Sequence, residues 1–347
     1  MQKAYQDYML EQVARLMTIP AVSGYSGPME RYLAEQTRLL GYAPTLLRQG
    51  GVVAELGGAG NGLLLLAHGD ELGLMVRKIM PNGRLRVVPC GGLHAQYCDR
   101  DNVTVITRGG GRYSGTIQQV NASTHIATPE HRTELRSFDA NMEIVLDEDV
   151  RSREDTEALG VRVGDVAALE PRYVLTPSGY LKGRFLDDKA CVALLFSYMK
   201  FLQDTGKTPC RNVWVDFTLF EEIGHGATCG IPEGVEEVMA LDVGSVGEAT
   251  DCDEHKVFIC AKDAAFPYHY DTVTRLLETA EQRGIPHTID IMYPSYGSDV
   301  NGTLRAGYDV RHCLIGPGVL ATHGYERTHL DALTATFDLL TAYTGVA

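Results

Sequence analysis

The chain has 347 residues, of which 44% are hydrophobic and 22% charged, so it can form one large core or two unequal domains. Its formal net charge of −14 argues against nucleic acid or an anionic membrane as the main partner. The longest apolar run, residues 63–67, has the length of a buried strand and not of a membrane span.

The chain contains eight cysteines but no Cys-x-x-Cys pair, which argues against a structural zinc knuckle. The first thirty residues do not have the composition of an export signal, and without one a disulfide framework is not expected in a chain of this length. We therefore expect reduced, mostly buried cysteines and a cytoplasmic location.

Two helices are predicted at the start of the chain. Apolar Met9, Val13 and Leu16 recur at helical spacing, and Ser26 with Pro28 marks the start of the second helix. After Gly41 the pattern changes to strands, which end with the apolar run at residues 63–67.

Short β-like segments fill residues 73–176. They are separated by glycine-rich turns and show little helical periodicity. We expect residues 74–176 to fold as a small β-rich domain, inserted into a larger domain that consists of residues 1–73 and 177–347.

Helices and strands alternate again after residue 183. The helical pattern covers residues 190–201, 272–283 and 328–343, and the strand pattern covers residues 213–220, 238–241, 288–292 and 310–315. Because strands and helices alternate on both sides of the insertion, we predict an α/β fold with a mixed sheet sandwiched by helices.

Acidic and imidazole side chains follow several of these strands. They are His68, Asp70, Glu221, Glu222, Asp242 and His323, and Asp187 stands just before a predicted helix. Because ligands collect outside the carboxyl ends of strands in open α/β sheets, these groups can converge. Each pair alone has an ordinary explanation, since adjacent acids often lie at helix N-termini or on the surface. Together they form a stronger pattern, because a buried carboxylate must be paired or bound to a cation.

The spacing within this pattern fits metal chemistry. His68 and Asp70 are two residues apart in an extended segment, so both can address one site and Asp70 can accept the ring N–H of His68. The side chains of Glu221 and Glu222 diverge, so that one can bind metal while the other takes a proton from the reacting water. An aspartate that bridges two cations would give each ion nitrogen and oxygen ligands, a set that suits zinc, cobalt or manganese.

Three segments carry the most specific signal. They read Ala67-His68-Gly69-Asp70-Glu71-Leu72-Gly73, Gly183-Arg184-Phe185-Leu186-Asp187-Asp188-Lys189 and Phe220-Glu221-Glu222-Ile223-Gly224. These segments resemble the signatures of the tetrahedral and glutamyl aminopeptidase family of dinuclear metallopeptidases. The resemblance covers almost the whole chain. It implies a phosphorylase/hydrolase-like catalytic domain with an inserted PDZ-like domain for dimerisation.

The resemblance also implies a role for each matching residue. His68 and Asp242 would bind one ion, Glu222 and His323 the other, and Asp187 would bridge the two. Glu221 would be the general base, and Asp70 would orient His68. The implied activity is removal of N-terminal residues from short peptides with a free N-terminus. The implied assembly is a dimer or a tetrahedral particle of twelve subunits.

Two residue assignments leave alternatives open. The family usually has a His followed by Ser and later an acid, whereas this chain reads Thr322-His323-Gly324-Tyr325-Glu326, and His329 competes as the last ligand. We prefer His323 because it follows its strand directly, whereas His329 falls where the last helix begins and would cap that helix or lie on the surface. Asp299, in Gly297-Ser298-Asp299, is a candidate partner for the substrate ammonium, and the alternative is a turn residue that caps a helix.

Other functions share part of the pattern. A carboxypeptidase or an amino-acid deacylase would have much of the ligand order, and a non-catalytic scaffold would keep the fold. The β-rich insertion favours the aminopeptidase, and the complete set of ligands and base argues against the scaffold. A paired-carboxylate glycosidase would give no role to His68 and His323.

Overall fold

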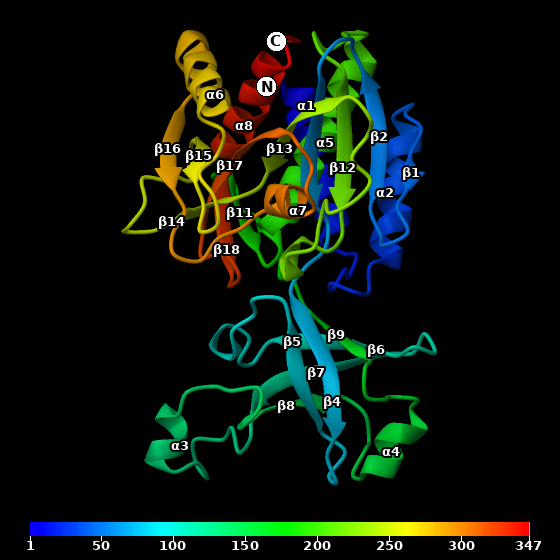
Figure 1. Ribbon diagram of the computed structural model, residues 1–347. Coiled ribbons are helices and arrows are strands. Elements are labelled where there is room, and N and C mark those ends of the chain that lie inside the picture. Colours follow the sequence, from blue (N-terminus) through cyan, green and yellow to red (C-terminus); the bar gives the residue numbers. More distant parts are fainter. Residues whose placement is uncertain (347) are drawn as a thin grey trace. The chain divides into compact units, whose positions relative to one another are not determined.

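The computed structural model describes residues 1–346 and divides the chain into two compact units (Figure 1). The α/β unit comprises Met1–Asp70 and Arg172–Ala347, and the barrel unit comprises Glu71–Pro171. The predicted mixed α/β fold is confirmed, and the inserted β-rich part is a closed barrel.

Within the described residues, the α/β unit contains a twelve-stranded sheet. Its central strands lie side by side and parallel, in the order β12 (Val213–Thr218), β3 (Gly62–His68), β13 (Val235–Leu241) and β17 (Arg311–Leu320). Every residue of β3 is buried. Such a continuous apolar run is typical of a parallel strand that is covered on both faces.

Further strands extend the sheet on both sides of this centre. On the β12 side follow β2 (Val52–Gly57) and β1 (Thr45–Leu46), and on the β17 side follow β18 (Glu326–His329), β11 (Tyr180–Gly183) and β10 (Val174–Leu175). β14 (Gly244–Val246) and β15 (Val257–Lys262) also pair with β17, and β16 (His287–Ile291) pairs with β15.

Helices of the α/β unit pack on both faces of the sheet (Figure 1). They are α1 (Lys3–Leu16), α2 (Gly27–Leu39), α5 (Leu186–Thr205), α6 (Tyr270–Arg283), α7 (Asp299–Arg305) and α8 (Leu330–Tyr343). α5 packs against β3 and α8 against β17, while α7 contacts β3, β13 and β17. Almost all of α5 is buried, including Phe196 and Tyr198, so this helix lies in the core.

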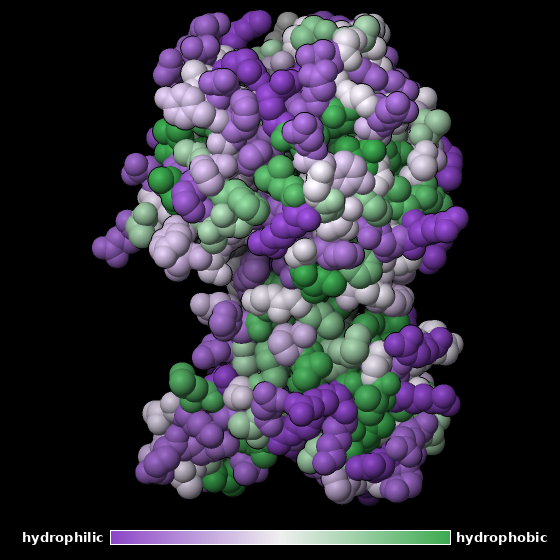
Figure 2. Space-filling view, in the orientation of Figure 1, coloured by the Kyte–Doolittle hydropathy of each residue, from purple (hydrophilic) through white to green (hydrophobic). Residues whose placement is uncertain are grey.

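The barrel unit closes through six antiparallel strands, all within the described residues. In spatial order they are β4 (Gly73–Ile79), β5 (Leu85–Cys90), β8 (Met142–Leu146), β7 (Arg112–Gln119), β6 (Asn102–Ile106) and β9 (Val166–Leu169). Apolar side chains such as Leu74, Val76 and Ile144 are buried, and closure leaves no free sheet edge. Short helices α3 (Pro129–Thr133) and α4 (Arg153–Ala158) lie in the connections. Figure 2 shows hydrophobic residues among hydrophilic ones on the visible surface of this unit.

Several predicted elements have different bounds in the structure, and three of these differences lie near the carboxyl ends of the central strands. β12 ends at Thr218, two residues before the predicted end, and the residues after it include a 3-10 turn, η2 (Glu221–Ile223). β17 continues five residues past the predicted end, to Leu320. The last helix begins at Leu330 and not at residue 328, because residues 326–329 pair with β11 as strand β18.

The remaining sequence expectations concern cysteines and membranes. No cysteine among the described residues takes part in a disulfide, and five of the eight are buried. Across residues 1–346, the structure has no helix that combines the length and the apolar character needed to cross a membrane.

Candidate active site

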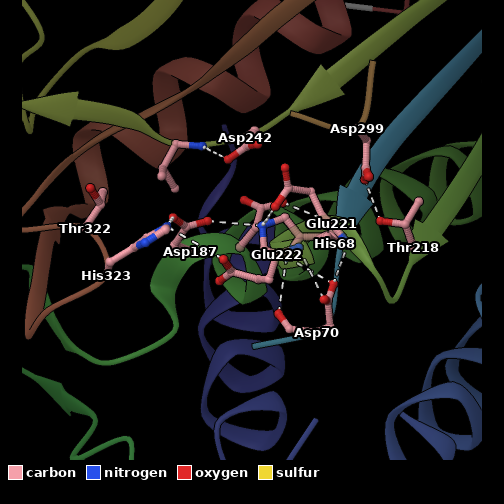
Figure 3. Close-up of polar contacts among 12 residues, drawn as sticks. His68, Asp70, Asp187, Thr218, Glu221, Glu222, Asp242, Asp299, Thr322 and His323 are labelled. Atoms are coloured by element: carbon pink, nitrogen blue, oxygen red, sulfur yellow. Dashed lines mark hydrogen bonds and ion pairs between the residues drawn. The ribbon is translucent and has the colours of Figure 1, made fainter. Parts of the chain in front are cut away.

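The predicted metal ligands meet at the carboxyl ends of the central parallel strands (Figure 3). His68 is the last residue of β3, and Asp242 directly follows β13. Asp187 lies in the first turn of α5, and Glu222 lies in η2, just beyond β12. His323 lies in the turn between β17 and β18. The sheet topology thus brings together residues that are spread over most of the chain.

Asp187 lies at the centre of this cluster. Its Oδ1 atom is 3.1 Å from Nε2 of His68, and its Oδ2 atom is 3.8 Å from Nε2 of His323. Nε2 of His323 is also 3.6 Å from Oε2 of Glu222. Ligand atoms of His68, Asp187 and Asp242 all lie within 4.8 Å of one another. The two oxygens of one carboxylate therefore face two imidazoles.

Asp70 supports the cluster from below in the view of Figure 3. Its Oδ1 atom is 3.5 Å from Nδ1 of His68, and its carboxylate accepts the backbone N–H groups of Glu221 and Glu222 at 3.2 and 3.4 Å. The hydroxyl of Ser23 donates to its Oδ2 atom at 2.6 Å. Asp70 thus holds the η2 turn through its carboxylate, and it holds the imidazole ring through that carboxylate and its backbone carbonyl, which lies 3.2 Å from Nδ1 of His68.

Burial and neighbouring charges set the protonation of the central pair. Burial disfavours the charged form of His68, but hydrogen bonds to Asp187 and Asp70 outweigh it and raise the pKa of the imidazole well above its usual value. Burial likewise disfavours the charge on Asp187, but the hydrogen bond with His68 outweighs it and lowers the pKa of that carboxyl.

The other acids of the cluster are held toward their neutral forms. Burial raises the pKa of Glu221, Glu222 and Asp242 well above its usual range. The charge of Asp187 raises the pKa of Glu222 and of Asp242 further. The cluster therefore lacks positive charge to match its carboxylates. Divalent cations would supply that charge, and imidazole with carboxylate is a donor set that suits zinc, cobalt or manganese. The residues present fit divalent cations.

Two residues in the turns that form the cluster have an uncommon backbone conformation. His323 has φ 62° and Phe185, two residues before Asp187, has φ 68°. Residues other than glycine rarely occupy this left-handed region, and those that do are concentrated at functional sites. The turns that present His323 and Asp187 both contain such a residue.

Sequence reasoning gave no role to two acids that hold the ligands. Glu326 accepts the backbone N–H of Asp187 at 3.1 Å and that of His323 at 3.1 Å. Asp188 accepts the backbone N–H of His68 at 3.2 Å. Asp188 could have been found from its place beside Asp187. The role of Glu326 depends on strand β18, which the sequence did not predict.

The structure places Asp299 to one side of the cluster, beside Thr218 (Figure 3). It is the first residue of α7, and the hydroxyl of Thr218 donates to its Oδ2 atom. Its Oδ1 atom packs so closely on Gly226 that a Cβ there would lie 1.8 Å away. Burial raises the pKa of Asp299 to about 7. Asp299 therefore contacts the loop that follows the two glutamates.

The structure also separates His323 from its competitor. His323 faces Asp187 and Glu222 within the cluster. His329 is the N-cap residue of α8, where its side chain accepts the backbone N–H of Asp331, and it belongs to a different group of side chains.

Comparison with known proteins identifies relatives over nearly the whole chain. Residues 50–339 match the family model described as M42 glutamyl aminopeptidase. YhfE of Bacillus subtilis (strain 168), which is provisionally named an aminopeptidase, is 37% identical over 96% of this chain and 96% of its own length. The lysyl aminopeptidase of Pyrococcus furiosus is 26% identical over 62% of this chain and 60% of its own length.

Solved structures share the fold. The TET1 peptidase of Pyrococcus horikoshii has a TM-score of 0.84 at 23% identity, over 97% of this chain and 99% of that chain. An aminopeptidase from Desulfurococcus kamchatkensis has a TM-score of 0.86 at 22% identity, over 99% of this chain and 96% of that chain.

The fold and the imidazole–carboxylate cluster define a metal-dependent hydrolase of peptide bonds. The chain belongs to the M42 glutamyl aminopeptidase family, and it is a metal-dependent aminopeptidase.

Proposed function

We propose that this aminopeptidase removes the N-terminal residue of short peptides with a pair of divalent ions, drawn from zinc, cobalt and manganese. The observation that carries the proposal is the position of Asp187, whose oxygens lie 3.1 Å from the ring of His68 and 3.8 Å from that of His323. Asp187 would be shared by the two ions. His68 and Asp242 would hold one ion, and Glu222 and His323 would hold the other.

Bound divalent ions would polarise the scissile carbonyl and make the reacting water more acidic. The residues of the chain then have separate tasks. Glu221, whose Oε2 atom is 3.8 Å from Nε2 of His68, is the general base that takes the water proton and passes it to the leaving amine. Asp70 fixes this base relative to the ligands, because it holds the η2 backbone and the ring of His68.

An enzyme that acts only at the N-terminus must recognise the free α-amino group of its substrate. We assign Asp299 as the partner of the substrate ammonium. Asp299 is a buried carboxylate beside the loop that follows the two glutamates, and an ammonium group would compensate its charge.

Kinetics with matched peptides test this assignment. Leu-Gly-Gly should be cleaved from its N-terminus and its N-acetyl form should resist. The variant Asp299→Asn should raise KM for the free peptide by about tenfold or more, as expected for loss of a charged hydrogen bond. Metal content should not change. Ready cleavage of the acetylated peptide, or release of residues from the C-terminus, would instead indicate a deacylase or a carboxypeptidase.

Assembly is the last part of the proposal. The barrel unit exposes large apolar side chains, namely Tyr97, Ile126, Leu135 and Val163. Exposed apolar side chains mark protein contacts where they lie together on one surface. The TET1 peptidase of Pyrococcus horikoshii can assemble into a tetrahedron or a large octahedral shell. We assign the barrel unit as a PDZ-like dimerisation domain whose dimers build a particle of twelve subunits.

Light scattering measures this assembly directly. The wild-type protein should have the mass of a dimer or a dodecamer at micromolar concentration. Leu135→Glu should lower that mass, because it places a charge on the apolar surface, whereas Glu148→Gln, a change at an exposed polar position of the same unit, should not. A wild-type monomer would contradict the assignment.

A further inference from the structure

Three side chains outside the candidate active site bring metal-ligand atoms together. His255 lies in the loop between β14 and β15, His329 ends β18, and Asp331 lies in the first turn of α8. Oδ2 of Asp331 is 3.0 Å from Nδ1 of His255 and 3.1 Å from Nδ1 of His329. We propose that His255, His329 and Asp331 bind a zinc ion of their own, separate from the ions of the active site.

The contacts of His329 direct its Nδ1 atom toward Asp331. Its Nε2 atom is 2.9 Å from the carbonyl oxygen of Ser178, which can only accept, so Nε2 carries the proton. In the neutral ring Nδ1 then has a lone pair, and it accepts the backbone N–H of Asp331 at 3.1 Å. The same lone pair faces the carboxylate oxygen of Asp331 at 3.1 Å. A proton on Nδ1 or a metal ion makes this contact favourable, and a metal ion on Nδ1 would replace the N–H of Asp331.

The outer nitrogens of both rings have the partners that a metal site needs. A ligating histidine normally donates its other ring N–H to a fixed acceptor. Nε2 of His329 has the carbonyl of Ser178, and Nε2 of His255 has the hydroxyl of Tyr180 at 3.2 Å. With Nδ1 of each ring on the ion, both Nε2–H groups remain satisfied.

The spacing of the ligand atoms also fits zinc. Ligand atoms bound at about 2.0–2.1 Å lie about 2.9–3.4 Å apart for angles between square and tetrahedral. The two nitrogen–oxygen separations of 3.0 and 3.1 Å fall in this range. All three ligand atoms lie within 4.8 Å of one another. The side chains of His255 and Asp331 are 44% and 64% exposed, so water can complete the coordination.

The surrounding residues hold the two rings in place. Their centroids are 4.2 Å apart, and the ring of Tyr180 packs edge-on against both, at 5.8 Å from His255 and 4.8 Å from His329. Arg327 lies over Tyr180 and binds both oxygens of Glu254, the neighbour of His255, at 2.7 and 2.8 Å. The ligands are therefore positioned before any ion binds.

A bound zinc ion would brace a strand that also serves the active site. β18 ends at His329 and begins at Glu326, which accepts the backbone N–H groups of Asp187 and His323. The ion would connect the end of this strand to α8 and to the β14–β15 loop.

Zinc binding by the full-length protein tests the proposal. Wild type, His255→Gln and Asp331→Asn are dialysed against buffered micromolar zinc, and the bound zinc is counted by elemental analysis. Each variant should bind one zinc per subunit less than wild type and should still cleave Leu-Gly-Gly. The control His125→Gln removes an exposed histidine of the barrel unit and should bind as much zinc as wild type.

A further variant tests the ligand role itself. His255→Cys keeps three ligands, so it should retain the ion and, with cobalt in place of zinc, show thiolate-to-cobalt absorption. Equal zinc content in wild type, His255→Gln and Asp331→Asn would overturn the proposal, and so would the absence of that absorption band.

Discussion

The variant Asp187→Ala should lose bound metal and should lose activity by about a thousandfold or more. The two oxygens of Asp187 face the rings of His68 and His323, so removing this carboxylate removes a ligand from both proposed ions. His68→Ala should lower metal content and rate as well, although it removes a ligand from one ion alone. Elemental analysis and hydrolysis of Leu-Gly-Gly measure the two effects in the same preparation.

The control for this experiment is Asp271→Ala, which removes an exposed carboxylate from the first turn of another helix, α6. It should keep the metal content and the rate of the wild type. Stoichiometric metal in active Asp187→Ala protein would contradict the bridging role, and active wild-type protein without metal would contradict the ligand set as a whole.

Glu221→Gln should retain metal but lose roughly two to four orders of magnitude in turnover, the range typical for removal of a general base. Glutamine has nearly the same shape as glutamate, so the η2 turn and its bonds to Asp70 should persist. What the variant loses is the ability to accept a proton.

Glu222→Gln is the matched comparison, because the two glutamates are adjacent and both belong to η2. Glu222 is 3.6 Å from Nε2 of His323, and its side chain is 3% exposed, against 14% for Glu221. We expect this variant to weaken metal binding. Equal metal loss in both variants, together with an active Glu221→Gln protein, would contradict the roles assigned to Glu221 and Glu222.

Much of the α/β fold could be predicted from the sequence because its central strands are long and apolar. The run at residues 63–67 could only be a buried strand, and β3 is buried along its whole length. Strand β18 could not be predicted in this way. Its four residues include Glu326 and Arg327, and they become a strand only because β11 and β17 lie beside them.

The same limit applies to the two groups of proposed metal ligands. Convergence at the active site could be predicted because parallel strands present their carboxyl ends at one edge of the sheet. No such rule predicts that His255, His329 and Asp331 lie together. His255 reaches the other two through a loop whose path depends on tertiary contacts, including that between Arg327 and Glu254.

Asp70 contacts both a proposed metal ligand and the turn that carries the proposed general base. Its carboxylate holds the backbone of both glutamates, and the ring of His68 contacts both that carboxylate and the backbone carbonyl of Asp70. A substitution there would disturb the proposed metal ligand His68 and the proposed general base Glu221 in one step. A change of the Asp70 side chain is therefore expected to affect the proposed ligand and the proposed base together.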